Sequence, residues 1–107
     1  MHTIADKAEI AIDFPDKFYR GGFGRDCAFE ARAEDDGVLI RLVRAGDERR
    51  VVEIHLHHLL FANILEDLAR SIEGRAPIDD LHRQPLLDAA HGLAAALAPR
   101  PAAPAGG

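Results

Sequence analysis

The sequence has little of several things that small proteins use for stability or for chemistry. Its 107 residues include one cysteine, Cys27, one serine, Ser71, no tryptophan and 6% aromatic residues. A lone cysteine excludes an intramolecular disulfide and favours a reducing compartment. The composition, 48% hydrophobic and 29% charged, is that of an ordinary globular domain. We expect one domain over residues 1–98 and a disordered Pro/Ala/Gly tail over 99–107.

Long hydrophobic runs and an excess of basic residues are also missing. Every apolar run falls far short of the ~20 residues that cross a bilayer, and the first residues lack the basic start and apolar core of a signal peptide. The net charge is −5, whereas binding to nucleic acid needs clustered Lys and Arg. The sequence therefore predicts a soluble, cytoplasmic protein that binds neither nucleic acid nor membrane.

Four segments alternate between apolar and polar residues with the period of two that is typical of half-buried strands. They are Ala8–Phe14, Cys27–Glu34, Val38–Arg44 and Arg50–His57. Pro15 ends the first, because proline has no N–H for a ladder. The glycine-containing segment 16–26 is predicted to be a loop. The last three strands should form a meander.

The register of this meander follows from its side chains. The inward apolar sets must lie opposite one another, because a slip of one residue turns a whole set to solvent. A four-residue turn after the second segment places Glu30 opposite Arg41, whereas a two-residue turn would place Arg32 there. Opposite charges across strands are favourable, so we predict that Arg41 lies between Glu30 and Glu53 on the outward face.

Two amphipathic helices are predicted to follow the strands. The first has apolar residues at helical spacing from Leu60 to Ile72 and ends at Gly74. The second is expected to begin near Pro85, because proline suits the first helical position. The predicted fold class is α+β: a four-stranded antiparallel meander followed by two helices packed on one face. The predicted core contains Ile10, Ile12, Phe14, Phe29, Ile40, Leu42, Val52, Ile54, Leu56, Phe61, Ile64, Leu65, Leu68, Leu86, Ala90, Leu93 and Leu97.

The segment His55-x-His57-His58 is a candidate metal site. His55 and His57 are two apart on a strand, so that their rings project from the same face. Imidazoles so placed bind Zn²⁺ or Ni²⁺ when further ligands arrive. The predicted register brings the turn Asp35-Asp36-Gly37 beside His57, which makes Asp36 the expected third ligand. The alternative is that both histidines are surface residues at a strand end.

The segment from Arg20 to Arg25 is a candidate ligand site. Exposed N–H groups of Gly22 and Gly24, flanked by Arg20 and Arg25, are suited to hold an anion. The segment lacks the spacing of a dinucleotide-binding loop and the lysine of a P-loop. The alternative is a loop that contacts a protein partner.

Catalysis is not favoured. Cys27 is the one candidate nucleophile, but it falls on the inward face with Phe29, where a thiol is inert. No cofactor is expected beyond a possible divalent metal ion.

The residues Phe61 to Leu97 resemble the closing helices of MocA-type sugar dehydrogenases, through Ile72-Glu73-Gly74-Arg75-Ala76-Pro77 and Leu87-Asp88-Ala89. The resemblance covers about a third of the chain. The cofactor-binding βαβ unit of those enzymes is absent from the sequence, so no function is carried over from it.

The function that the sequence favours is a small, non-catalytic protein-interaction module that forms a homodimer. Leu39, Val43 and Val51 fall on the outer face of the sheet among charges, so that this face is suited to an interface. Unpaired edge strands are a second reason to expect a partner chain. The alternative is a metal- or small-ligand-binding protein that uses the strand end at His55 and His57.

Overall fold

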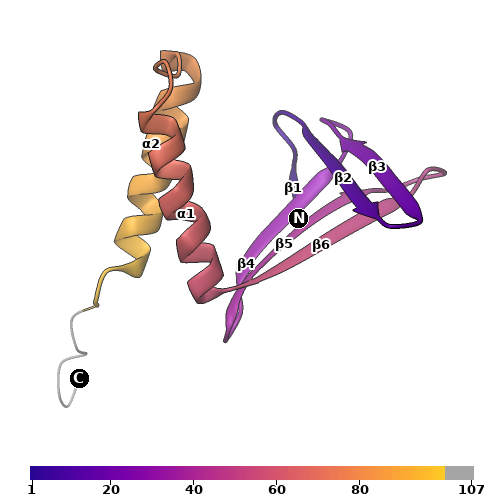
Figure 1. Ribbon diagram of the computed structural model, residues 1–107, viewed down its shortest axis with the longest axis horizontal. Coiled ribbons are helices and arrows are strands. Elements are labelled where there is room, and N and C mark those ends of the chain that lie inside the picture. The colour runs from indigo at the N-terminus through magenta and orange to yellow at the C-terminus, as the bar shows by residue number, and fades with distance from the viewer. Residues whose placement is uncertain (101–107) are drawn as a thin grey trace. The chain divides into compact units, whose positions relative to one another are not determined.

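The computed structural model describes residues 1–100 and has an α+β fold (Figure 1). Six strands precede two helices along the chain. The elements are β1 His2–Thr3, β2 Ala8–Phe14, β3 Lys17–Phe23, β4 Ala28–Ala33, β5 Gly37–Arg44, β6 Arg50–His57, α1 His58–Glu73 and α2 Asp80–Leu97. Two compact units result, Met1–Leu68 and a second that begins at Ala69. The prediction of one domain over 1–98 therefore stays a prediction.

A four-stranded antiparallel sheet with the order β1-β4-β5-β6 is the largest element of the first unit. The predicted fold class is confirmed, and so is the register of the meander. Arg41 lies opposite Glu30 on β4 and opposite Glu53 on β6. Ala33 and Val38 are the last pair between β4 and β5, and the four residues 34–37 between them form the predicted turn.

The fourth strand of this sheet is not the predicted one. β1, only two residues long, pairs with β4 through His2 and Phe29, whereas the segment Ala8–Phe14 belongs to a separate two-stranded sheet with β3. The expected loop over 16–26 is therefore wrong over Lys17–Phe23. Pro15 and Asp16 do not stop the sheet but form a two-residue turn, since Phe14 pairs directly with Lys17. A fixed φ near −65° suits proline to such a corner.

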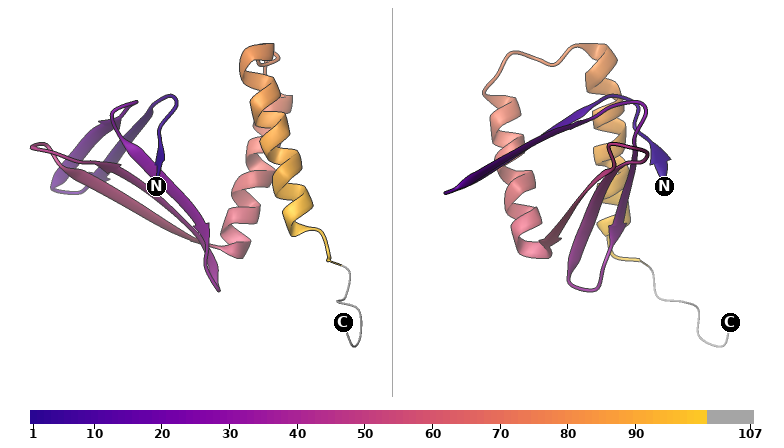
Figure 2. Two further views of the ribbon diagram at one scale, coloured as in Figure 1. Left: turned by 180° about the vertical axis from the view of Figure 1, so that it is seen from behind. Right: turned by 90° about the vertical axis from the view of Figure 1, so that its right-hand side faces the viewer.

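The β2–β3 hairpin lies against one end of the large sheet. The right-hand view of Figure 2 shows its open end close to the sheet and its turn pointing away. The side chains between them form the core: Ile4, Phe23 and Cys27 are buried, and Ala8, Ile10, Phe29, Leu42 and Val52 pack against these three. The predicted core is wrong in extent, because Ile12, Phe14 and Ile54 are exposed. The hairpin covers only the end of the sheet that the β5–β6 turn closes.

The two helices have the predicted type, with one shifted boundary. α1 begins at His58, directly after β6, and is followed by Gly74, whose N–H donates to the Arg70 carbonyl at 3.1 Å. α2 begins at Asp80, so the predicted start at Pro85 is wrong. Asp79 caps this helix, since its Oδ1 accepts a hydrogen bond from the His82 N–H at 3.2 Å.

Helical residues of the predicted core are exposed as well: Ile64, Leu68, Leu86, Ala90, Leu93 and Leu97. The packing of the helices on one face of the sheet stays a prediction. No helix among residues 1–100 is both long and apolar enough to cross a membrane. Most of the predicted tail, 101–107, lies outside the described residues.

Candidate functional sites

The two histidines of the candidate metal site lie on edge strand β6, at the end of the sheet that the β4–β5 turn closes. His55 is opposite Leu39, and His57 is opposite Gly37. Their rings are 5.0 Å apart between centroids. This is the expected geometry for residues i and i+2 of a strand, because alternate side chains leave the same face.

The β4–β5 turn brings Asp36 to these histidines. The Glu34 N–H donates to the Gly37 carbonyl at 2.8 Å, and the His58 N–H donates to the Asp36 carbonyl at 3.2 Å. Gly37 is buried, and any Cβ there would overlap the Leu56 carbonyl. Glycine is therefore needed at 37, because the turn passes so close to β6 that no side chain fits.

The polar atoms of the three side chains converge. Asp36 Oδ1 lies 3.0 Å from His55 Nε2, and Asp36 Oδ2 lies 3.9 Å from His57 Nε2. One possible ligand atom from each residue can be chosen so that all lie within 4.8 Å of one another. The structure thus brings together the three residues of the predicted metal site. All three are exposed, so a metal ion would reach them from solvent.

His58, the third histidine of the segment, takes a different position. It is the first residue of α1, and its Nε2 lies 3.4 Å from the Asp35 carbonyl oxygen. Two imidazoles and one carboxylate, rather than three imidazoles, therefore make up the cluster. This donor set suits Zn²⁺ and other imidazole-preferring divalent ions.

The predicted anion site has a different structure from the one expected. Arg20 and Gly22 are residues of β3, and Gly24 and Arg25 follow in the turn before β4. Arg50 reaches across from β6 and donates from Nη1 to the Gly22 carbonyl at 3.3 Å. A Cβ at Gly21 would stand 3.1 Å from this Nη1, so the glycine leaves room for Arg50. Anion binding at this segment stays a prediction.

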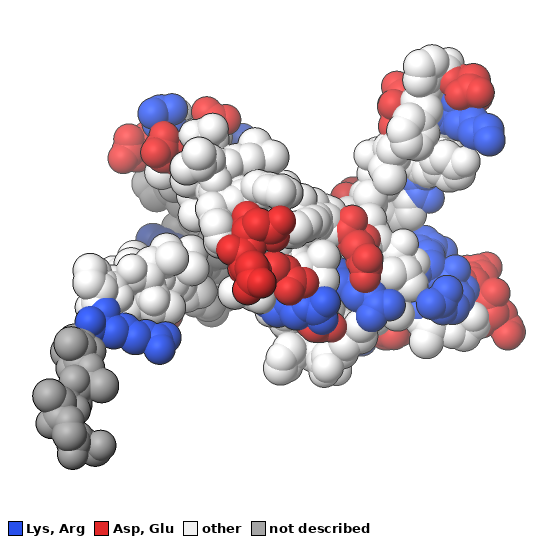
Figure 3. All heavy atoms as spheres, turned by 90° about the horizontal axis from the view of Figure 1, so that it is seen from below, with Lys and Arg blue, Asp and Glu red and all other residues white. Residues whose placement is uncertain are grey.

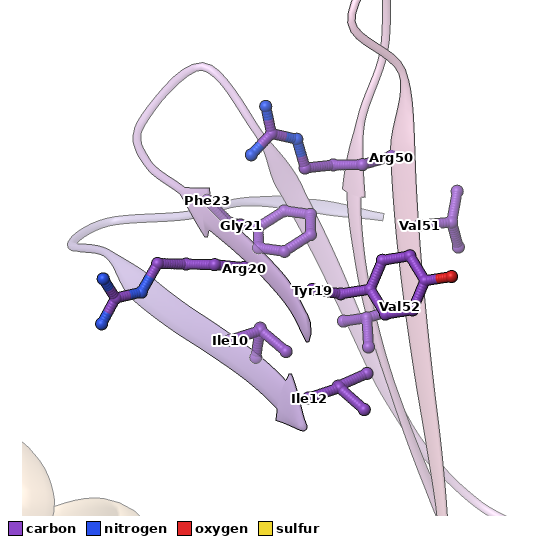
Figure 4. Close-up of a pocket in the computed structure, with 9 residues that line it drawn as sticks. All are labelled: Ile10, Ile12, Tyr19, Arg20, Gly21, Phe23, Arg50, Val51 and Val52. Carbon is purple, nitrogen blue, oxygen red and sulfur yellow. The ribbon is translucent and has the colours of Figure 1, made fainter. Parts of the chain in front are cut away.

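An apolar cleft opens between the hairpin and β6. It has a volume of about 370 Å³ and is lined by Ile10, Ile12, Tyr19, Arg20, Gly21, Phe23, Arg50, Val51 and Val52. Figure 4 shows Ile10, Ile12 and Val52 pointing into the space between the hairpin and β6, whereas Arg20 points away from it. The sequence does not predict the cleft, because its glycines indicate a loop where β3 forms. The alternation of Ile10, Ile12 and Phe14 does indicate an apolar face on β2, which forms one side of the cleft.

The predicted interface residues lie on the other face of the sheet, in the order expected. Val43 pairs with Val51, and Leu39 pairs with His55. Val51 is exposed, and Leu39 and Val43 are half-buried. Their use as an interface stays a prediction.

Charges interleave on the same face. Arg41 Nε lies 3.2 Å from Glu53 Oε1. Glu30 faces Arg41 but accepts from Arg32 Nη1 at 2.7 Å. Hydrogen bonds to Glu30 and Glu34 raise the pKa of the Arg32 guanidinium. Figure 3 likewise shows acidic and basic side chains next to one another, which is unlike the continuous positive surface that nucleic-acid backbones require.

Cys27 is buried at 4% exposure, as predicted. Its Sγ lies 3.4 Å from Asp26 Oδ1. A thiol that is packed among apolar side chains is shielded from reagents. The position therefore supports a packing role for Cys27 rather than a nucleophilic one.

Comparison with protein-family models, with curated proteins and with solved structures finds no match to this chain.

Proposed function

We propose that the chain is a non-catalytic interaction module that self-associates through edge strand β6 and the apolar cleft beside it. The observation that carries the proposal is the exposed apolar surface around the cleft. Ile12, Phe14 and Tyr19 of the hairpin and Ile54 of β6 are all exposed. These side chains gather around one cleft, whereas the apolar residues on the surface of a typical monomer are scattered singly.

The exposed area is in the range that a dimer needs. Phe14 and Tyr19 are about half exposed, so each presents roughly 100 Å². Ile12 and Ile54 bring the surface to roughly 300 Å². A standard interface buries about 800 Å² per partner, and a little over half of this is apolar. The cleft and the β6 edge thus supply most of the apolar area of one side.

A second copy of the chain is the partner that this surface fits best. β6 is eight residues long and pairs with β5 alone within the described residues. The free edge of a strand is self-complementary in antiparallel pairing, because its N–H and C=O groups alternate. Symmetric dimers need such a self-complementary surface. Pairing also removes the exposed edge, which is otherwise prone to aggregation.

Sedimentation equilibrium over a micromolar concentration series tests the proposal. We expect the wild-type chain to have twice its monomer mass of 11.7 kDa. Phe14→Asp should raise the dimer dissociation constant about 30-fold. The variant places a charge where the proposed interface would bury a ring, and this costs ~2 kcal/mol of binding free energy.

Phe18→Asp is the matched control. Phe18 is 58% exposed and Phe14 is 51% exposed, and both lie next to the same turn. Phe14 shares the cleft-facing side of the hairpin with Ile12, whereas Phe18 pairs with Asp13 on the opposite side. We expect Phe18→Asp to remain dimeric. A wild-type mass of 11.7 kDa throughout the series, or equal effects of the two variants, would contradict the proposal.

A further inference from the structure

We propose that Asp36, His55 and His57 form a binding site for one Zn²⁺ ion that joins the β4–β5 turn to the end of β6. The inference does not rest on self-association, because all three ligands belong to one chain. It rests on the donor set, on the distances and on the way in which the backbone holds the turn.

The donor set is the first argument. Zn²⁺ binds imidazole nitrogen and carboxylate oxygen at about 2.0–2.2 Å, and sites with three protein ligands leave the fourth position to water. Both imidazoles present Nε2 towards Asp36, which lies within 3.9 Å of each of these nitrogens. Neighbouring ligand atoms of a tetrahedral zinc ion are roughly 3.3 Å apart, a spacing that follows from these bond lengths. Small side-chain rotations are therefore enough to bring the three donors to one ion.

The fixed position of the turn is the second argument. A metal site gains affinity when its ligands are held in place before the ion arrives. The β4–β5 turn is closed by two backbone hydrogen bonds, Glu34 to Gly37 and His58 to Asp36. Gly37 fits against the Leu56 carbonyl only because it has no side chain. The Asp36 backbone is thus set beside β6 without the metal, and binding costs little ordering of the chain.

A bound ion would have a structural effect. Asp36 belongs to the turn and the two histidines to β6, and α1 begins at the residue after His57. Zinc would link the turn to the strand end from which α1 starts, and the stabilisation would grow with the logarithm of the free zinc concentration above the dissociation constant.

The experiment is a titration of the full-length, tag-free chain with ZnCl₂ in competition with a chromophoric zinc chelator. A histidine tag must be absent, since it would bind zinc itself. We expect one ion per chain. His55→Gln, His57→Gln and Asp36→Asn should each weaken binding at least ~10-fold, as the loss of one of three ligands requires. These replacements retain size and hydrogen-bonding capacity, and circular dichroism checks that each variant is folded.

His82→Gln is the matched control. His82 also faces a carboxylate, with Nδ1 2.8 Å from Asp79 Oδ1, but within the described residues it belongs to no group of three possible metal ligands. We expect its zinc affinity to equal that of the wild type. Zinc should also raise the thermal midpoint of the wild type and of His82→Gln but not of His55→Gln. Absence of stoichiometric binding, or binding that the double variant His55→Gln/His57→Gln retains, would overturn the proposal.

Discussion

The two ends of the four-stranded sheet differ in the kind of interaction that organises them. At the end with the β5–β6 turn, the hairpin covers the sheet, and Ile4, Phe23 and Cys27 are buried between them. At the end with the β4–β5 turn, the side chains of Asp36, His55 and His57 converge in contact with solvent. The strands are shared, so the difference arises from what lies next to each end.

This contrast separates stability from ligand binding. Burial of apolar side chains is the dominant favourable term in folding, and in the first unit it is concentrated at one end of the sheet. Exposed pairs of charged or polar groups contribute little to stability. The residues at the polar end are therefore free to change with small effect on folding, unless they hold the backbone in place. Gly37 is such an exception.

Phe23→Ala should have the largest effect, because it opens a cavity at the apolar end. We expect a loss of about 3 kcal/mol in the free energy of unfolding, measured by urea denaturation. Cys27 should also change from slow to fast labelling by a thiol reagent, since Phe23 shields it in the core. His55→Gln is the comparison at the polar end and should change stability by less than about 0.5 kcal/mol without metal. Equal effects of the two variants would remove the contrast.

Gly37→Ala tests the exception at the polar end. The added methyl overlaps the Leu56 carbonyl, so the turn must move away from β6 at a cost of about 2 kcal/mol. Zinc affinity should fall together with stability, because Asp36 moves with the turn. Gly22→Ala is a suitable control, since its nearest contact, with the Ala8 carbonyl, is an ordinary 3.9 Å. If Gly37→Ala has the same urea midpoint of unfolding as the wild type, the close approach of the turn to β6 does not require glycine at 37.

The middle of the sheet should show a smaller effect. Arg41 and Glu53 form an ion pair at 3.2 Å with partly exposed side chains. A double-mutant cycle with Arg41→Ala and Glu53→Ala should give a coupling energy of about 0.5 kcal/mol that decreases with added salt. A coupling above about 2 kcal/mol would mean that this pair, and not the apolar end, contributes a large part of the stability of the sheet.

The smallest expected effect is the loss of α2 helicity in acid, and it concerns a helix rather than the sheet. The hydrogen bond from His82 lowers the pKa of Asp79, the N-cap residue. The stabilising contribution of a carboxyl with a lowered pKa is present above its unfolded pKa of about 3.9 and is lost as the pH falls through the folded value. Helicity of the wild type should therefore exceed that of Asp79→Ala at pH 6, and circular dichroism should show the difference vanishing near pH 2. A constant difference would contradict the role of the carboxylate charge.

The sequence predicts those parts of the fold that repeated patterns specify. Alternation and charge pairing gave the register around Arg41 correctly, and this register brings Asp36 towards His57. β1 has only two residues and therefore no period to detect. β3 was missed because Gly21 and Gly22 are weak strand formers, and the reason for Gly21, the Arg50 side chain, comes from a strand far along the chain.

The extent of the core could not be predicted in the same way. Strand periodicity identifies which side chains share a face, but it does not say what covers that face. Ile10 and Phe14 belong to one apolar row of β2, yet Ile10 packs against the core and Phe14 is exposed. The start of α2 was misplaced for a related reason: Pro85 is a strong helix-start signal, and the cap at Asp79 outweighs it.

The contrast between the two ends is tested most directly by an NMR titration of the ¹⁵N-labelled, tag-free chain with ZnCl₂. We predict that chemical-shift changes saturate at one ion per chain and concentrate at Asp36, Gly37 and His55 to His58. The amides of Phe23 and Cys27 at the apolar end should keep their positions. Changes centred on Cys27, or no saturable change at residues 34–37 and 55–58, would contradict the assignment of ligand binding to the polar end and packing to the apolar one.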